Sequence, residues 1–284
     1  MKKLVSLLLT GTLALGLLAG CGSNGGGAAA TPTPATGGDP AQAVTLKIGA
    51  SPAPHEEILQ VVKEILAGQG ITLEIVEFTD YIQPNEAVES GDIDANYFQH
   101  ITYMNNFNAE QGTHLASVAE IHYEPMGIYA GRAASLTDLP DGAEIGVPND
   151  PTNGGRALLL LQEQGLITLP EDAGLEPTVL DIVDNPHNFK ITEMEAAQLP
   201  RSLDSLDVAV VNGNYAIQAG LKVSDALAIE SAEGTAGTAY VNVLTVKEGR
   251  ENETAIQALA EAMKSQQVKD YITETYGGAV VAVF

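Results

Sequence analysis

Residues 144–156 read Glu-Ile-Gly-Val-Pro-Asn-Asp-Pro-Thr-Asn-Gly-Gly-Arg. An apolar strand over 144–148 is followed by Asp150, a favourable helix N-cap, and by Pro151, which suits the first turn of a helix. This order predicts a helix over 151–164 that begins where a strand ends. The free N–H groups and the dipole of such a helix start favour a bound anion.

Arg156 lies within the first two turns of that predicted helix. Its planar guanidinium can bind a carboxylate through two parallel hydrogen bonds. Gly154 and Gly155 lower the helix propensity at the same place. They would either let a ligand approach closely or pack tightly against the sheet, and the sequence leaves both interpretations open.

Outward from this segment, short apolar strands alternate with amphipathic helices. This rhythm predicts an α/β fold with mostly parallel sheets and with ligands at the carboxyl ends of the strands. Two such α/β units suggest a clamp-like solute-binding protein, although the same folds also host enzymes. The predicted strands are 44–49, 71–78, 93–96, 144–148, 178–183, 189–194, 208–211 and 240–246, and the predicted helices are 55–67, 84–91, 102–111, 151–164 and 253–276.

Residues 92–103 contain a second candidate site. The start Asp-x-Asp-x-Asn resembles a calcium loop, but Tyr97 replaces the glycine at position six and Tyr103 replaces the glutamate at position twelve. A better interpretation is a strand that ends in Phe98, His100 and Tyr103, lining a pocket for an apolar or thioether side chain. The alternative places Phe98 in the core and makes His100 a surface cap.

Two asparagines are further candidates. Asn212 follows the apolar run 208–211, where it could bind an ammonium or a carboxylate, or simply cap a turn or helix. Asn242 interrupts the apolar strand 240–246, and an amide there is costly unless it is hydrogen-bonded.

The N-terminus has the features of an export signal. Lys2 and Lys3 precede an apolar run that is too short to favour spanning a bilayer. The run ends in Leu-Ala-Gly before Cys21, which resembles a bacterial lipobox. We therefore expect a signal peptide over 1–20, lipidation of Cys21 (diacylglycerol and palmitate-type acyl chains) and a flexible Gly-, Thr- and Pro-rich linker over 21–43.

Composition excludes several classes of function. The chain has 37 acidic and 13 basic residues and a formal charge of −24, so nucleic acid is not an expected partner. One cysteine allows no internal disulfide. Nucleophile, phosphate-loop and dinucleotide motifs are missing from the sequence. The five histidines, at positions 55, 100, 114, 122 and 187, have no metal-ligand spacing, so we expect surface or capping roles, no metal, no cofactor and no enzymatic activity.

Several ordered motifs resemble the NlpA/MetQ family, the methionine-binding lipoproteins of ABC importers. They cover the chain from about residue 46 to its end and comprise 78–85, 91–100, 147–153, 155–161, 198–203 and 240–242. The resemblance implies a two-lobed, periplasmic-binding-protein-like fold of type II with a ligand cleft between the lobes. The implied lobe 1 is 44–130 plus 239–284, and the implied lobe 2 is 131–238.

The resemblance also implies the site. Arg156 would hold the α-carboxylate of a free amino acid, with Asn153, Asn212 and Asn242 fixing the carboxylate and ammonium. Tyr81, Phe98, His100 and Tyr103 would enclose the side chain. The implied protein is lipid-anchored at the outer face of the cytoplasmic membrane and delivers its ligand to an ABC permease with its ATPase.

Two departures bear on the ligand. A proline-rich loop at 51–55 and the pair Gly213-Asn214 are unusual for the family, and both fall near the expected cleft. Methionine is the first choice of ligand, with its D-isomer, a methionine-containing dipeptide or another apolar amino acid as alternatives. An extracytoplasmic peptide hydrolase and a surface adhesin are the competing functions.

Overall fold

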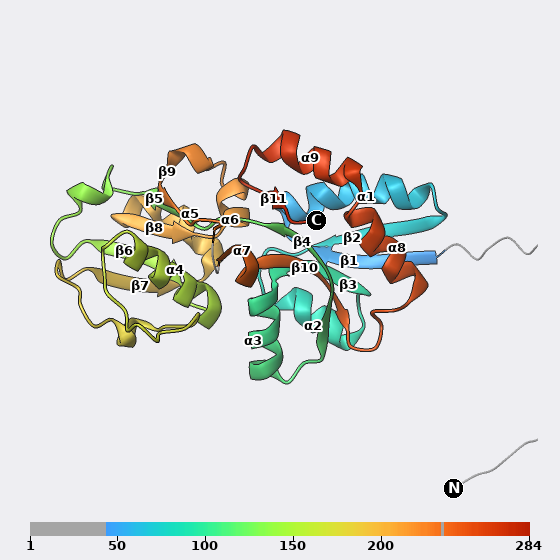
Figure 1. Ribbon diagram of the computed structural model, residues 1–284, viewed down its shortest axis with the longest axis horizontal. Helices are drawn as coiled ribbons and strands as arrows, with labels where there is room; N and C mark the ends of the chain where they lie inside the picture. The colour runs from blue at the N-terminus through green and yellow to red at the C-terminus, as the bar shows by residue number, and fades with distance from the viewer. Residues whose placement is uncertain (1–43, 234–235) are drawn as a thin grey trace, which may run out of the picture. The chain divides into compact units, whose positions relative to one another are not determined.

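The computed structural model of the protein describes residues 44–233 and 236–284. They build two mixed β-sheets, each flanked by helices (Figure 1). The predicted signal segment 1–20, Cys21 and the linker to residue 43 lie outside the described residues. Among the described helices, none combines the length and the apolar character needed to cross a membrane.

The first sheet has the strand order β11-β4-β10-β3-β1-β2. Strand β1 runs parallel to β2 and β3, whereas β10 runs antiparallel to both β3 and β4. The strands are β1 (Val44–Ala50), β2 (Ile71–Glu77), β3 (Ala95–His100), β4 (Leu115–Tyr123), β10 (Val241–Lys247) and β11 (Val281–Ala282).

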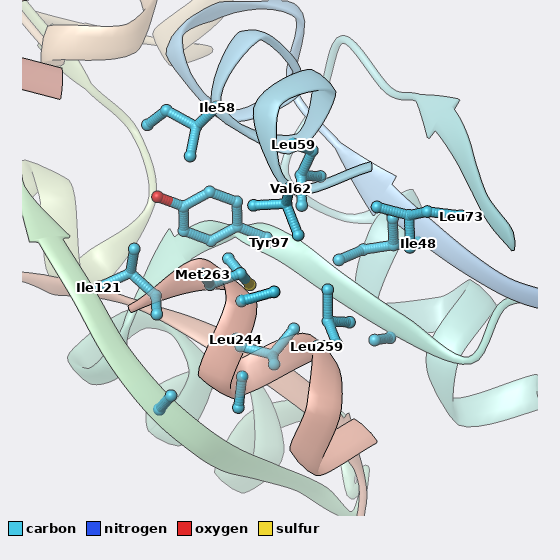
Figure 2. Packing of buried hydrophobic residues seen from close by; sticks show 14 of the residues in the cluster. Ile48, Ile58, Leu59, Val62, Leu73, Tyr97, Ile121, Leu244, Leu259 and Met263 are labelled. Atoms are coloured by element: carbon cyan, nitrogen blue, oxygen red, sulfur yellow. The ribbon is translucent and has the colours of Figure 1, made fainter. Parts of the chain in front are cut away.

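Helix α1 (Glu57–Ala67) shows why helices cover this sheet. Its residues Ile58, Leu59, Val62 and Leu66 recur at helical spacing and are fully buried. They pack with side chains of β1, β3 and α8 in the main core of the lobe (Figure 2). The other helices associated with this sheet are α2 (Gln83–Ser90), α3 (Ile101–Gln111), α8 (Thr254–Met263) and α9 (Gln266–Tyr276).

The second sheet has the order β7-β6-β8-β5-β9 and its own apolar core. Strand β6 is parallel to β7 and β8, while β5 is antiparallel to β8 and β9. The strands are β5 (Gly127–Ala130), β6 (Glu144–Pro148), β7 (Lys190–Met194), β8 (Val208–Val211) and β9 (Ala226–Ile229). The helices of this half and of the return to the first sheet are α4 (Pro151–Glu163), α5 (Leu199–Ser202), α6 (Gly213–Gln218) and α7 (Ala236–Ala239).

Most predicted elements are present. The segment 253–276 divides into α8 and α9, because Ser265 caps a new helix by accepting a hydrogen bond from the N–H of Val268. Helix α2 begins near Pro84 and ends at Gly91, whose φ of +84° suits glycine.

Two predictions about the strands are wrong. The sheets are mixed rather than mostly parallel, since β4, β5 and β9 were not predicted and β10 runs antiparallel to its neighbours. The segment 178–183 contains a 3₁₀ turn over Val179–Asp181 and no strand. There Thr178 and Asp181 cap each other, and Leu180 is 91% exposed, so its apolar character reflects no burial.

The chain passes between the sheets after β4 and again between β9 and β10. The prediction ends the first part of lobe 1 at residue 130. Strand β5 (Gly127–Ala130), however, is hydrogen-bonded to β8 and β9 and so belongs to the second sheet. The change of sheet therefore falls between Tyr123 and Gly127. The rest of the proposed division into lobes stays a prediction.

Candidate ligand-binding site

A cavity lies between residues of both sheets. All eight predicted ligand-binding residues line it: Tyr81, Phe98, His100, Tyr103, Asn153, Arg156, Asn212 and Asn242. Five further residues that were not predicted as ligand contacts complete the wall: His55, Gln99, Glu124, Gly213 and Asn214.

Strand direction brings these residues together. His100 ends β3, Asn212 directly follows β8, and Glu124 directly follows β4, so each comes from the carboxyl end of a strand. Strand β10 runs the other way, which places its beginning at the same edge, and Asn242 there pairs with His100. The cavity thus forms where the sheet topology predicts ligands.

The start of α4 confirms the predicted cap. The carboxylate of Asp150 accepts hydrogen bonds from the backbone N–H of Asn153 at 2.9 Å and from the Thr152 hydroxyl at 3.0 Å. The anion that this helix start favours is therefore the side chain of Asp150 itself. Burial raises the pKa of Asp150, and the hydrogen bonds from Asn153 oppose that rise.

Arg156 is 4% exposed and is held by a partner that sequence analysis missed. Its Nε donates to Glu230 Oε1 at 3.0 Å and its Nη2 donates to Glu230 Oε2 at 2.5 Å, while Nη2 also donates to the carbonyl of Glu124 at 2.8 Å. Burial alone would lower the pKa of Arg156, but the Glu230 carboxylate raises it above its usual range. Among the described residues nothing accepts a hydrogen bond from Nη1.

The asparagines form a linked set with unused hydrogen-bonding capacity. Asn153 Oδ1 accepts from Asn212 Nδ2 at 2.7 Å and from His100 Nε2 at 3.2 Å, and its Nδ2 donates to Asp150. The amide of Asn153 is thus engaged on both sides. In contrast, Asn212 Oδ1 and Asn214 Nδ2 are buried without a partner among the described residues. Such atoms are costly unless a ligand or water bonds to them.

Aromatic rings form the other part of the wall. The Tyr81 ring lies 5.8 Å from Phe98, 5.7 Å from Tyr103 and 4.9 Å from Tyr215, measured between centroids. The Tyr81 hydroxyl donates to Asn214 Oδ1 at 2.5 Å, which links the two sheets across the cavity. Phe98 is both a core residue, as one prediction had it, and a wall residue, as the other had it.

The expectation of surface histidines is wrong for three of the five. His55, His100 and His122 are 1%, 6% and 0% exposed. His100 caps α3 as predicted, since its Nδ1 accepts from the N–H of Tyr103, but it does so in the interior. Burial and, to a smaller extent, the Arg156 charge lower the pKa of His100 to about 3.

The glycine pair of α4 has a packing role. A Cβ on Gly155 would lie 2.6 Å from the carbonyl oxygen of Leu175, and one on Gly154 would lie 2.9 Å from that of Pro148. Both clashes are with backbone, whereas neither glycine lines the cavity. These contacts support the interpretation in which the glycines serve packing.

Both unusual segments of the sequence supply walls of the cavity. The loop at 51–55 positions His55, whose Nε2 donates to Asn242 Oδ1 at 3.0 Å. A Cβ on Gly213 would lie 2.8 Å from that of Glu124, so glycine lets α6 approach Glu124 closely. No local pattern could have indicated Glu124 or Glu230, because only the packing of distant segments brings them to the cavity.

Comparisons with known proteins agree with this arrangement. The sequence profile of the NlpA lipoprotein family matches residues 46–284. The membrane lipoprotein TpN32 of Treponema pallidum is 43% identical over 239 residues, which are 84% of this chain and 88% of that protein. The D-methionine-binding lipoprotein MetQ of Escherichia coli K12 is 39% identical over 240 residues, 83% of this chain and 87% of that one.

A solved structure is similar over the same region. A nutrient-binding protein from Burkholderia cenocepacia bound to methionine is 41% identical, with a TM-score of 0.80 over 84% of this chain and all of that one. The fold of this chain is that of these two-lobed binding proteins. From the profile match, the relatives and the shared fold, we conclude that this chain belongs to the NlpA lipoprotein family.

Proposed function

We propose that this chain is the extracytoplasmic substrate-binding lipoprotein of an ABC importer and that it carries L-methionine in the cavity between its two sheets. The observation that carries the proposal is the pairing of unused polar atoms with aromatic rings in one buried cavity. Arg156 Nη1, Asn212 Oδ1 and Asn214 Nδ2 could bond to a zwitterion, and Tyr81, Phe98 and Tyr103 could surround an apolar side chain.

The polar end matches an amino acid group by group. Arg156 Nη1 and the amide N–H groups of Asn242 and Asn214 would donate to the α-carboxylate. Because His55 Nε2 and Asn242 Oδ1 are bonded, the Nδ2 of Asn242 is the part of its amide left for a ligand. Asn212 Oδ1 and the Glu124 carboxylate would accept from the ammonium. Asn153 and His100 would act as positioning residues that hold Asn212.

The aromatic end suits a thioether. Sulfur makes favourable contacts with aromatic rings, and an unbranched side chain adapts to an irregular cavity. Methionine is therefore preferred to the branched apolar amino acids. The names of the relatives make D-methionine a further candidate ligand, and a methionine-containing dipeptide is a third.

Contacts between residues of the two sheets would distinguish the ligand-bound state from the ligand-free state. Besides the bond from Tyr81 to Asn214, His100 contacts Asn153 and the Tyr215 hydroxyl donates to the carbonyl of Thr79 at 3.2 Å. A ligand held by residues from both lobes would favour this closed arrangement, and the permease would recognise it. The lipid on Cys21 and the linker to residue 43 would keep the protein at the outer face of the cytoplasmic membrane.

The test is mass spectrometry of the small molecules released when the purified full chain, held in detergent, is unfolded. We expect methionine in an amount close to one per chain. The competing ligands would give another apolar amino acid or a dipeptide. If the unfolded protein releases no amino acid or peptide, and the refolded protein binds none from an equimolar mixture, the proposed function is wrong.

A further inference from the structure

Three side chains of metal-ligating type converge beside the cavity. His55 Nε2 lies 3.4 Å from Glu124 Oε1, and His122 Nε2 lies 2.6 Å from the same oxygen. One ligand atom from each residue falls within 4.8 Å of the other two. His55 is separated from the other two by more than sixty positions, which is why the sequence showed no metal-ligand spacing.

The orientation of both imidazole rings is fixed by a hydrogen bond at Nδ1, the nitrogen on the side away from Glu124. The Nδ1 of His55 is bonded to the Ser51 hydroxyl at 2.8 Å, and the Nδ1 of His122 is bonded to the Tyr97 hydroxyl. Metal-binding histidines typically use their second nitrogen in this way, since a partner there fixes the orientation of the ring. Both Nε2 atoms are thus directed at Glu124.

The cluster contains a buried carboxylate. Glu124 is 5% exposed, and its ion-pair partners among the described residues are the two histidines. The nearby guanidinium of Arg156 is already paired with Glu230. A buried carboxylate is costly unless it is paired with a cation or coordinates a metal, and neutral imidazole is the form of histidine that binds metal ions.

We propose that His55, His122 and Glu124 bind a divalent transition-metal ion of the zinc class in the ligand-free protein. Two imidazole nitrogens and one carboxylate oxygen suit zinc or cobalt better than calcium or magnesium, which prefer oxygen. Asn242 Oδ1, 3.0 Å from His55 Nε2, is placed to serve as a further ligand. Since His55, Glu124 and Asn242 line the cavity, the ion would enter through it. Because the Glu124 carboxylate is also the proposed acceptor for the ligand ammonium, the metal ion and the amino acid would compete for it.

The experiment uses the full chain in detergent, freed of small molecules by unfolding and refolding and freed of metal by a chelator that is then removed. Zn²⁺ is titrated by calorimetry, and Co²⁺ is titrated by visible absorption. We expect one ion per chain and Co²⁺ bands of a four- or five-coordinate site. Absence of binding by this protein would overturn the proposal.

Variants locate the ion. Glu124→Gln and His55→Gln keep the size of the side chain approximately and should weaken Zn²⁺ binding by at least about 100-fold. Tyr97→Phe removes the partner behind His122 and should weaken it by about 10- to 100-fold. Circular dichroism confirms that each variant is folded.

His114→Gln and His187→Gln are the matched controls. Each removes a largely exposed histidine whose Nδ1 lies beside a carboxylate, 3.3 Å from Glu89 and 2.8 Å from Asp141. Their Zn²⁺ affinity should equal that of the unchanged protein. If Glu124→Gln and His55→Gln bind as tightly as these controls, the ion lies elsewhere and the assignment is wrong.

Discussion

At the scale of single residues, Glu230 determines how Arg156 can act. It occupies Nε and Nη2 of the guanidinium, so in the proposed binding mode Nη1 is the nitrogen left to donate to a ligand, instead of a fork of two nitrogens. The ring of Tyr240, 4.2 Å from the guanidinium carbon, supports the same orientation. A fixed cation of this kind loses little freedom when a carboxylate binds.

Arg156→Ala should weaken methionine binding by about 2–5 kcal/mol, because the change leaves the ligand carboxylate without its charged partner in a buried site. Calorimetry with the full chain, freed of bound small molecules by unfolding and refolding, measures the methionine affinity. The matched control is Arg132→Ala, which removes a half-exposed arginine paired with Asp207 outside the cavity. If both variants bind methionine with unchanged affinity, Arg156 does not hold the ligand.

Tyr81→Phe should weaken binding by about 0.5–1.5 kcal/mol, the usual contribution of one hydrogen bond. The ring remains against Phe98 and Tyr103, but the hydroxyl no longer fixes Asn214. The preference for methionine over leucine should persist, since the apolar wall is unchanged. A competition assay with both amino acids decides this, and a variant with unchanged affinity would show that Asn214 needs no such support.

Which residues could be predicted depended on their local sequence. Arg156 and Asp150 lie in a strand–helix junction, and its residue pattern alone predicts where the helix begins. Asn242 could be noticed because it is a polar residue within an apolar strand. Glu124 is one of many acidic residues in the chain, and His55 drew attention only as part of the unusual proline-rich loop at 51–55. Their roles arise only when β4, the loop at 51–55 and α6 pack together, which no short pattern encodes.

At the scale of elements, α4 shows how closely the segments of the second lobe pack. Gly155 lies against the backbone of Leu175 and Glu176, and any side chain there would require the helix or the 175–176 segment to move. This contact holds the helix that carries Arg156.

Gly155→Ala should lower the free energy of unfolding by about 1–3 kcal/mol, despite the better helix propensity of alanine, because backbone atoms cannot give way easily. Urea unfolding measures the effect. Gly68→Ala, at the end of α1 where the nearest atom is 3.3 Å away, is the control and should cost clearly less. Equal stability of Gly155→Ala and the unchanged protein would contradict the packing role.

The strands that could not be predicted have one of two physical causes, mixed polarity or short length. Strand β4 mixes Ser117, Glu120 and His122 with apolar residues, because its two faces meet different surroundings along its length. Strands β5 and β9 have only four residues each, too few for an alternating pattern to be recognised. The long, regular helices were predictable because each buries one continuous face. The apolar strands β6 and β8 were predictable because nearly all of their residues are buried, and in β1 burial is concentrated in the second half.

At the scale of the whole molecule, stability should depend on pH through the buried histidines. The pKa values of His55, His100 and His122 are lowered to about 4, 3 and 3, whereas the unfolded chain takes up these protons near pH 6.5. The unfolded state therefore binds more protons below pH 6.5, and stability falls as the pH drops from 7 towards 4. Glu124 and Asp150, whose pKa values are raised by burial, oppose part of this trend.

Between pH 7 and pH 5 each of these histidines should contribute on the order of 1–2 kcal/mol of lost stability. Urea unfolding at both pH values, with a chelator present, measures the difference. His100→Asn should reduce it, while His187→Gln, at a half-exposed position, should leave it unchanged. A protein equally stable at both pH values would contradict the neutral, buried state of the three rings.

In the proposed function, residues from both sheets close on one amino acid in the cavity. A crystal of the stripped protein grown with L-selenomethionine tests this most directly, with selenium located by its anomalous scattering. We predict one peak bounded by the rings of Tyr81, Phe98 and Tyr103, with the ligand carboxylate bonded to Arg156. A ligand peak outside this cavity, or one beside Arg156 with the carboxylate among the rings, would contradict the proposed binding mode.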